Sequence, residues 1–228
     1  MPNIENEKYE VYLRDYEFTD AEIVDETFCS ELDEEDAELA EDVLPRSFTA
    51  SNSKFVGCTF LVDDLWEIEL NNCEFANCTF RSQDPNIFIA ITNDWRVLRC
   101  KFYNCEFSDF EKKFGAADAC EFYNSKFDDV TVRNFYLGSE KFYGCKLDDV
   151  SCDRATAKNL LLHECKFDPE EGIELTKCTI SILRVDYCED VSVDAIDKMN
   201  KDEATEIDFL YIDGNDRHHY FHLGNLMY

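Results

Sequence analysis

The residues of this 228-residue chain that could do chemistry are its cysteines, a group of histidines and its recurring aspartates. Twelve cysteines could form disulfides or hold zinc. The chain starts without the basic and apolar segments of a secretory leader, so we expect no disulfide framework. The pairs Cys73/Cys78 and Cys100/Cys105 have four intervening residues, whereas zinc sites use closer pairs such as C-x2-C. We therefore expect no metal at the cysteines.

Three histidines lie together in the segment HHYFH, at His218, His219 and His222. Neighbouring side chains of a strand point to opposite faces, which separates His219 from the other two, so we expect a capping strand rather than a metal site. The chain has no G-x-S-x-G, phosphate-loop or H-E-x-x-H motif. Cleavage of acidic polysaccharides by carboxylates and calcium is disfavoured because the chain would repel a polyanion. The sequence predicts no enzyme, no catalytic residue and no cofactor.

The charge of the chain is strongly negative, with 51 Asp and Glu against 22 Lys and Arg and a net charge of −29. This excess repels nucleic acid and anionic membranes and favours a basic surface on a partner protein. Hydrophobic residues make up 45% of the chain, including 19 Phe, so a folded core is expected. No run of about 18 apolar residues occurs, and we expect a cytoplasmic protein without a membrane span.

A repeat of twenty residues must position these side chains. The segment CKFYNCEF begins at Cys100, CEFYNSKF begins at Cys120, and EKFYGCKL begins at Glu140. Within this stretch an apolar residue recurs every five positions, and only Lys112 in the series is charged: Phe102, Phe107, Lys112, Ala117, Phe122, Phe127, Val132, Leu137, Phe142 and Leu147. The residues two positions earlier are mostly small or apolar, with Glu140 as the exception.

A period of five fits neither a helix, with a period of 3.6, nor a plain strand, with a period of 2. It requires a chain that turns a corner every five residues and sends two side chains of each five inward. Four corners close a square in twenty residues, and residues twenty apart then stack as parallel strands about 4.8 Å apart. The inward cysteines are expected to be buried free thiols that act as small hydrophobic residues.

Pentapeptides with a small residue, any residue, Phe or Leu and two polar residues resemble those of the pentapeptide repeat family, over about residues 12–190. The resemblance implies an all-β fold, a right-handed quadrilateral parallel β-helix. Within the family, the chain is similar to the acidic members that imitate DNA and bind type II topoisomerases, including the quinolone-resistance proteins. Those proteins have loops that interrupt the coils, and they end in a helical dimerisation module.

Two domains are expected on this basis. Residues 1–190 form the β-helix, with insertions near 31–46 and 81–99 where the five-residue register breaks. Residues 191–228 form a small capping or dimerisation segment. Within that segment, 191–200 could be one helix, and 206–223 has the pattern of a hairpin around Asp213-Gly214.

The expected partner-binding surface is an edge of the β-helix that carries two aspartates per coil. Its members are Asp109, Asp128, Asp129, Asp148, Asp149 and Asp168. With coils about 4.8 Å apart the edge has a carboxylate every 2.4 Å or so. Duplex DNA carries one charge per about 1.7 Å, so the two densities are comparable. The alternative is that aspartate simply favours corner turns and that the acidic surface is only solvated.

Both insertions hold further candidates for partner contact. Glu34, Glu35 and Asp36 belong to the acidic insertion, and Phe88 and Trp95 belong to the apolar one. The apolar insertion either touches a partner or folds back on the wall. A separate outward column, formed by Tyr103, Tyr123, Tyr143 and His163, either contacts a partner or covers the sheet.

The function predicted from these features is that of a DNA-mimicking acidic protein. It would bind the DNA-binding groove of an enzyme, such as a type II topoisomerase or a restriction or defence nuclease, and inhibit or protect it. The expected partner is a DNA-binding protein with a basic groove, with no direct binding of nucleic acid or membrane and with homodimerisation through 191–228. The alternative is a non-enzymatic interaction scaffold that uses the β-helix wall and loop 81–99.

Overall fold

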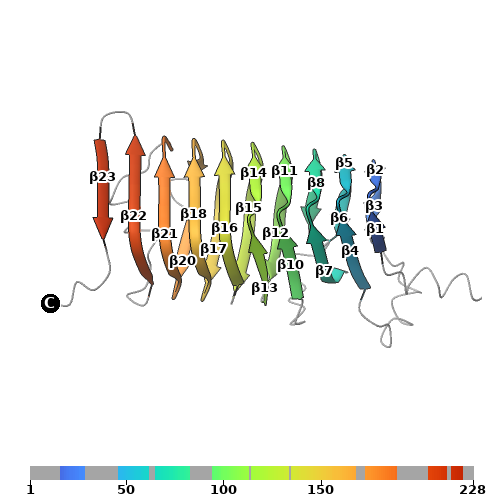
Figure 1. Ribbon diagram of the computed structural model, residues 1–228, viewed down its shortest axis with the longest axis horizontal. Coiled ribbons are helices and arrows are strands. Elements are labelled where there is room, and N and C mark those ends of the chain that lie inside the picture. Colours follow the sequence, from blue (N-terminus) through green and yellow to red (C-terminus); the bar gives the residue numbers. More distant parts are fainter. Residues whose placement is uncertain are drawn as a thin grey trace, which may run out of the picture.

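The computed structural model describes nine stretches of the chain, and all of their regular elements are strands. These stretches are 16–28, 46–61, 65–82, 94–112, 114–133, 135–167, 173–188, 205–214 and 217–222. The strands stack side by side along one long axis, from β1 at one end to β23 at the other (Figure 1). The chain is a right-handed quadrilateral parallel β-helix, as the sequence predicts.

The four walls of this β-helix follow from the strand pairing. The first wall contains β1 (Tyr16–Thr19), β4 (Arg46–Ser51), β7 (Leu65–Asn71), β10 (Asp94–Leu98), β13 (Phe114–Asp118) and the first part of β16 (Phe135–Tyr143). The second wall contains β2 (Glu22–Val24), β5 (Lys54–Val56), β8 (Glu74–Ala76), β11 (Lys101–Tyr103), β14 (Glu121–Tyr123) and the rest of β16. Strands β18 (Thr156–His163), β21 (Thr179–Asp186) and β22 (Glu206–Gly214) run along both walls.

The third wall contains β3 (Thr27–Phe28), β6 (Thr59–Leu61), β9 (Thr79–Arg81) and β19 (Lys166–Phe167), with the first parts of β12 (Glu106–Lys112), β15 (Lys126–Arg133) and β17 (Lys146–Asp153). The fourth wall contains the second parts of the last three strands and β20 (Ile173–Thr176). β23 (Arg217–His222) pairs antiparallel with β22, which confirms the hairpin. The predicted turn position is wrong, because Asp213 and Gly214 belong to β22 and pair with His218 and Arg217, so the turn follows Gly214. Residues 191–200, the candidate helix, lie outside the described residues.

The interior is built from the five-residue series as stacked columns of side chains. The rings of Phe75, Phe102, Phe122 and Phe142 stack with centroids 4.7–4.9 Å apart, which matches the spacing of the strands. A second phenylalanine column rises from the third wall, and its rings meet those of the first column edge to face, for example Phe122 and Phe127 at 5.4 Å. Large buried rings in these two arrangements form a continuous part of the hydrophobic core.

The corners explain why asparagine, aspartate and glycine recur at one position of the repeat. Two residues after many of the inward centres, the backbone has a positive φ, as at Asn104 (51°) after Phe102 and Asp109 (58°) after Phe107. Asparagine, aspartate and glycine tolerate this left-handed conformation better than other residues do. Corners with these residues turn at little conformational cost. Six described positions of positive φ carry other residues, namely Arg99, Ala119, Arg154, Glu164, Lys177 and Tyr187.

The cysteines pack inside the β-helix, as the sequence predicts. Nine of the eleven described cysteines are buried, and all eleven are free thiols. The thiols donate to backbone carbonyl oxygens inside the walls, as Cys120 does to Val97 at 3.3 Å. Among the described residues there is no group of His, Cys, Asp or Glu that could hold a metal ion, and no helix long and apolar enough to cross a membrane.

Glu140 is the one charged side chain in the inward series of small residues, and it is buried with 1% of its surface exposed. Its Oε2 accepts a hydrogen bond from the backbone N–H of Cys120 at 3.0 Å, while Oε1 has no hydrogen-bond partner. Burial raises the pKa of this carboxyl to about 7. A partner protein cannot reach it, so Glu140 matters for stability rather than for contact.

Candidate protein-binding surface

The corner between the third and fourth walls places two of the expected aspartates in one exposed row. Asp109 and Asp129 both occupy the corner position with a positive φ, and both are exposed. The pairing of β12 with β15 stacks them one above the other on successive coils. The structure therefore places these two carboxylates next to each other along the axis of the β-helix.

Lysines partly neutralise the neighbouring row of aspartates. Asp128 and Asp148 are in register on the third wall, and each is half-buried. Lys126 lies 2.6 Å from Asp128, and Lys146 is paired with Asp148 in the same way. Each pair is two residues apart on one strand and therefore on one face of it. The aspartate edge is thus less negative than its aspartates alone indicate.

The other expected contact residues fall into two groups. The side chain of Asp149, on β17, is not described, and Glu34, Glu35, Asp36, Phe88 and Asp168 lie outside the described residues. Trp95, by contrast, is among the described residues, and the expectation that it contacts a partner from loop 81–99 is wrong. It lies on β10 with 8% of its surface exposed.

Trp95 is buried because it occupies an inward position of the five-residue register of the β-helix. It pairs with Ile68 on one side and Gly115 on the other, inside the first wall. A Cβ at Gly115 would lie 2.7 Å from the carbonyl oxygen of Trp95 and 2.5 Å from the ring of Phe135, so only glycine fits between these two large residues. Trp95 stands two positions before Val97, as Cys100 stands before Phe102, and this spacing identifies it as an inward residue.

Most of the negative charge lies outside the described stretches. These stretches contain 26 Asp and Glu against 17 Lys and Arg, which leaves −9 of the total of −29. On the second wall, acids and bases alternate between coils, and Lys141 and Lys101 approach Glu121 to 2.9 and 3.5 Å. The bonds to Lys141 are the main reason why the pKa of Glu121 is lowered. The central part of the wall is therefore close to neutral.

The first coil is the most acidic part of the described chain. Residues 16–28 contain no lysine or arginine, and they carry five exposed acidic residues: Glu17, Asp20, Glu22, Asp25 and Glu26. Lys54 of the next coil lies 3.7 Å from Glu22, but both side chains are exposed, so this pair contributes little. Because β1, β2 and β3 end their sheets, these carboxylates surround one end of the β-helix (Figure 1). The sequence alone could have identified this acidic coil, because residues 16–28 contain five acidic residues and no lysine or arginine.

A column of aromatic side chains covers part of the second wall. Tyr103, Tyr123 and Tyr143 stack with centroids 5.0 Å apart and ring planes within 10°. His163 and Tyr187 continue the column edge to face. The outward column predicted from the twenty-residue repeat is therefore present. The rings of the three stacked tyrosines face each other, and only Tyr187 of the column is exposed.

The chain is only distantly similar to known proteins. No family model matches the chain, and no curated protein matches it. Among solved structures, two trypsin-treated variants of QnrB1, a plasmid-mediated fluoroquinolone resistance protein, align with 84% of this chain and 91% of theirs. The identities are 13% and 12%, and the TM-scores are 0.28 and 0.25. A likeness at this level carries no argument about function.

Proposed function

We propose that the chain is a DNA-mimicking acidic protein. It would bind the DNA-binding groove of an enzyme, such as a type II topoisomerase or a restriction or defence nuclease, and either inhibit or protect that enzyme. The observation that carries this proposal is the first coil, where five exposed carboxylates surround one end of a rigid rod without a base among them. The proposal assigns no catalytic activity to the chain.

Shape and charge together support this assignment. A basic groove attracts a rod with closely spaced negative charges in the way it attracts DNA, through long-range steering and local pairing with lysine and arginine. Asp109 and Asp129 form a second negative row on later coils, with one carboxylate per coil or about 4.8 Å, and Ser82 takes this corner position on the preceding coil. The segment 31–42, between the first and second coils in sequence, adds eight acidic residues and no base.

A competition assay tests the proposal. Purified type II topoisomerase and, separately, a restriction endonuclease would be loaded with fluorescently labelled duplex DNA, and the chain would be titrated in at several salt concentrations. The proposal expects displacement of DNA from at least one enzyme, with an apparent affinity that falls steeply as salt rises. Absence of displacement from both enzymes at low salt would count against it.

A second candidate function, an interaction scaffold, is favoured by the near-neutral second wall with its aromatic column. Such a scaffold would use the wall and the remaining part of loop 81–99 for contact, without Trp95. Its binding would persist at high salt and would weaken when Tyr187, with 51% of its surface exposed, is replaced by alanine. Homodimerisation through 191–228 and a cytoplasmic location also belong to the proposal, and light scattering after size exclusion tests the first of these.

A further inference from the structure

One corner of the β-helix carries a column of thiols that the proposed function does not use. Its members, on successive coils between the second and third walls, are Cys58, Cys78, Cys105, Ser125, Cys145, Cys165 and Cys188. Cys165 and Cys188 each follow the paired residues Leu162 and Val185 by three positions, so they stand at the same point of neighbouring coils. The backbone N–H of Cys165 donates to Sγ of Cys188 at 3.3 Å.

The spacing of this pair suits a disulfide. In-register residues of neighbouring parallel strands lie about 4.8 Å apart, within the Cα separation of 4.4–6.8 Å or so that disulfides span. Other neighbours in the column share this spacing, but they are buried, with exposures of 0–2%. Cys188 is the last described member and is only half-buried, so it is the member of the column most open to an oxidant in solution.

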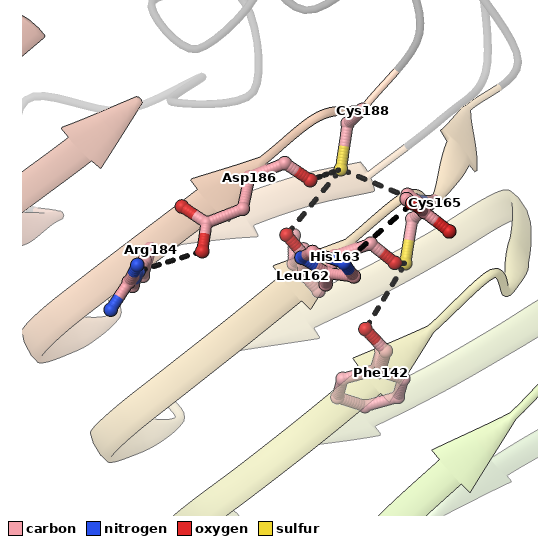
Figure 2. A network of polar contacts seen from close by, with 8 residues as sticks. Phe142, Leu162, His163, Cys165, Arg184, Asp186 and Cys188 are labelled. Carbon is pink, nitrogen blue, oxygen red and sulfur yellow. Dashed lines mark hydrogen bonds and ion pairs between the residues drawn. The ribbon is translucent and has the colours of Figure 1, made fainter. Parts of the chain in front are cut away.

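The surroundings of the two thiols assign them different roles (Figure 2). Cys188 donates to the carbonyl oxygens of Leu162 and Asp186, at 3.5 and 3.6 Å, and its contact with Cys165 lowers its pKa. The contact with Cys145 lowers the pKa of Cys165, but the contact with Cys188 and burial outweigh it and raise the pKa to about 12. Cys188, the thiol with the lowered pKa, is therefore the more accessible of the two, whereas Cys165 is buried and stays protonated.

The charged side chains close to the pair belong to two ion pairs. Arg184 pairs with the buried Asp186 at 2.7 Å, and the two residues flank Val185 in the strand that leads to Cys188. His163 lies 3.8 Å from Glu164, just before Cys165 in sequence. Asp186 and Glu164 oppose the ionisation of Cys188, while the hydrogen bonds from Cys165 favour it.

We propose that Cys165 and Cys188 form an oxidisable dithiol that links β18 to β21 when the protein meets a peroxide. The Cys188 thiolate attacks one peroxide oxygen, the O–O bond breaks, and a sulfenic acid and hydroxide form. Cys165 then gives its proton to that hydroxide and attacks the sulfenic sulfur, and a second hydroxide leaves and is protonated. In total, two thiols and one hydrogen peroxide give one disulfide and two waters. The new bond would link neighbouring coils at the corner that follows β21, where the described stretch 173–188 ends.

Peptide mapping after oxidation of the folded protein tests this proposal. The chain would be treated with graded hydrogen peroxide, alkylated, digested with trypsin and analysed by mass spectrometry without reduction. Lys166, Lys177 and Arg184 separate Cys165, Cys178 and Cys188 into different peptides, so each link has its own mass. Replacing Cys29, which lies outside the described residues, with serine removes one competing thiol.

The expected result is that the Cys165–Cys188 link is the first disulfide to form and that C188S loses it. Serine fits this position because Ser125 occupies the same column. C78S, at a buried position of that column, should leave the link unchanged, and a circular dichroism spectrum checks that each variant folds. A first disulfide at another pair, or Cys188 oxidised beyond the sulfenic acid with no link to Cys165, would overturn the proposal.

Discussion

Replacing Glu140 with glutamine should make the β-helix more stable, and the gain should grow with pH. Glutamine keeps the shape of the side chain and the oxygen that accepts from the Cys120 N–H at 3.0 Å. It removes the need to ionise a group that has 1% of its surface exposed and an oxygen without a partner. E140Q therefore removes the free-energy cost of keeping an ionisable carboxyl buried in the folded state, a cost that the unfolded chain does not have.

The size of this effect follows from the pKa of the carboxyl, about 7 in the folded chain against 4.5 ordinarily. Below pH 4.5 the group is protonated in both states and costs nothing. Between pH 4.5 and 7 the unfolded chain ionises while the folded chain does not, so stability falls as pH rises. The cost reaches about 1.4 kcal/mol at pH 5.5 and about 3 kcal/mol at pH 8.5, by linkage at 1.36 kcal/mol per pKa unit.

Urea denaturation of both proteins, followed by circular dichroism at pH 5.5 and 8.5, measures the difference. The many other carboxylates change stability with pH in both proteins alike, so the comparison isolates Glu140. We expect the advantage of E140Q to increase by about 2 kcal/mol between the two pH values. An advantage that stays constant over this range would refute the assignment of a raised pKa, and a loss of stability at pH 8.5 would refute the cost of burial itself.

Three further predictions concern the core, the corners and the acidic edge. Trp95→Ala should destabilise the fold by about 3–5 kcal/mol in the same denaturation assay, because it empties a space in the core; a nearly neutral change would mean that Trp95 lies on the surface. Asn104→Ala should cost about 1 kcal/mol, whereas Asn104→Gly should cost much less, because the corner needs a positive φ; equal costs would point to the side-chain bond with Asn77 at 3.4 Å instead. Changing both Asp109 and Asp129 to asparagine should leave stability nearly unchanged and reduce the salt dependence of DNA displacement, and an unchanged salt dependence would remove this edge from the proposed interface.

Much of the fold can be predicted from the sequence because each coil repeats the same physical requirement. Phe102, Phe122 and Phe142 stack because a five-residue register permits only one arrangement of corners, and the cysteines fill the narrow inward positions. Trp95 shows where the prediction failed, since a phase change at an insertion hid a residue that obeys the register. The same register, applied after the insertion, would have placed it correctly.

The candidate surface is less predictable than the fold because a total charge does not say where the charges lie. Lys126 and Lys146 share a face with Asp128 and Asp148, so strand alternation alone could have identified the neutralised row. The alternation of Lys101, Glu121 and Lys141 across coils follows from the twenty-residue step in the same way.

The proposed function depends most directly on the five exposed carboxylates of the first coil. They would be changed together to the matching amides, E17Q, D20N, E22Q, D25N and E26Q, which keep the side-chain shapes and the corner residues at positive φ. A control with five exposed acids of the other coils changed in the same way, E69Q, E74Q, E106Q, E164Q and E206Q, alters the net charge equally. Displacement of DNA from the responsive enzyme at low salt should weaken about tenfold or more in the first variant and far less in the control. Equal weakening in both would show that only net charge matters and would contradict a binding site at this end of the β-helix.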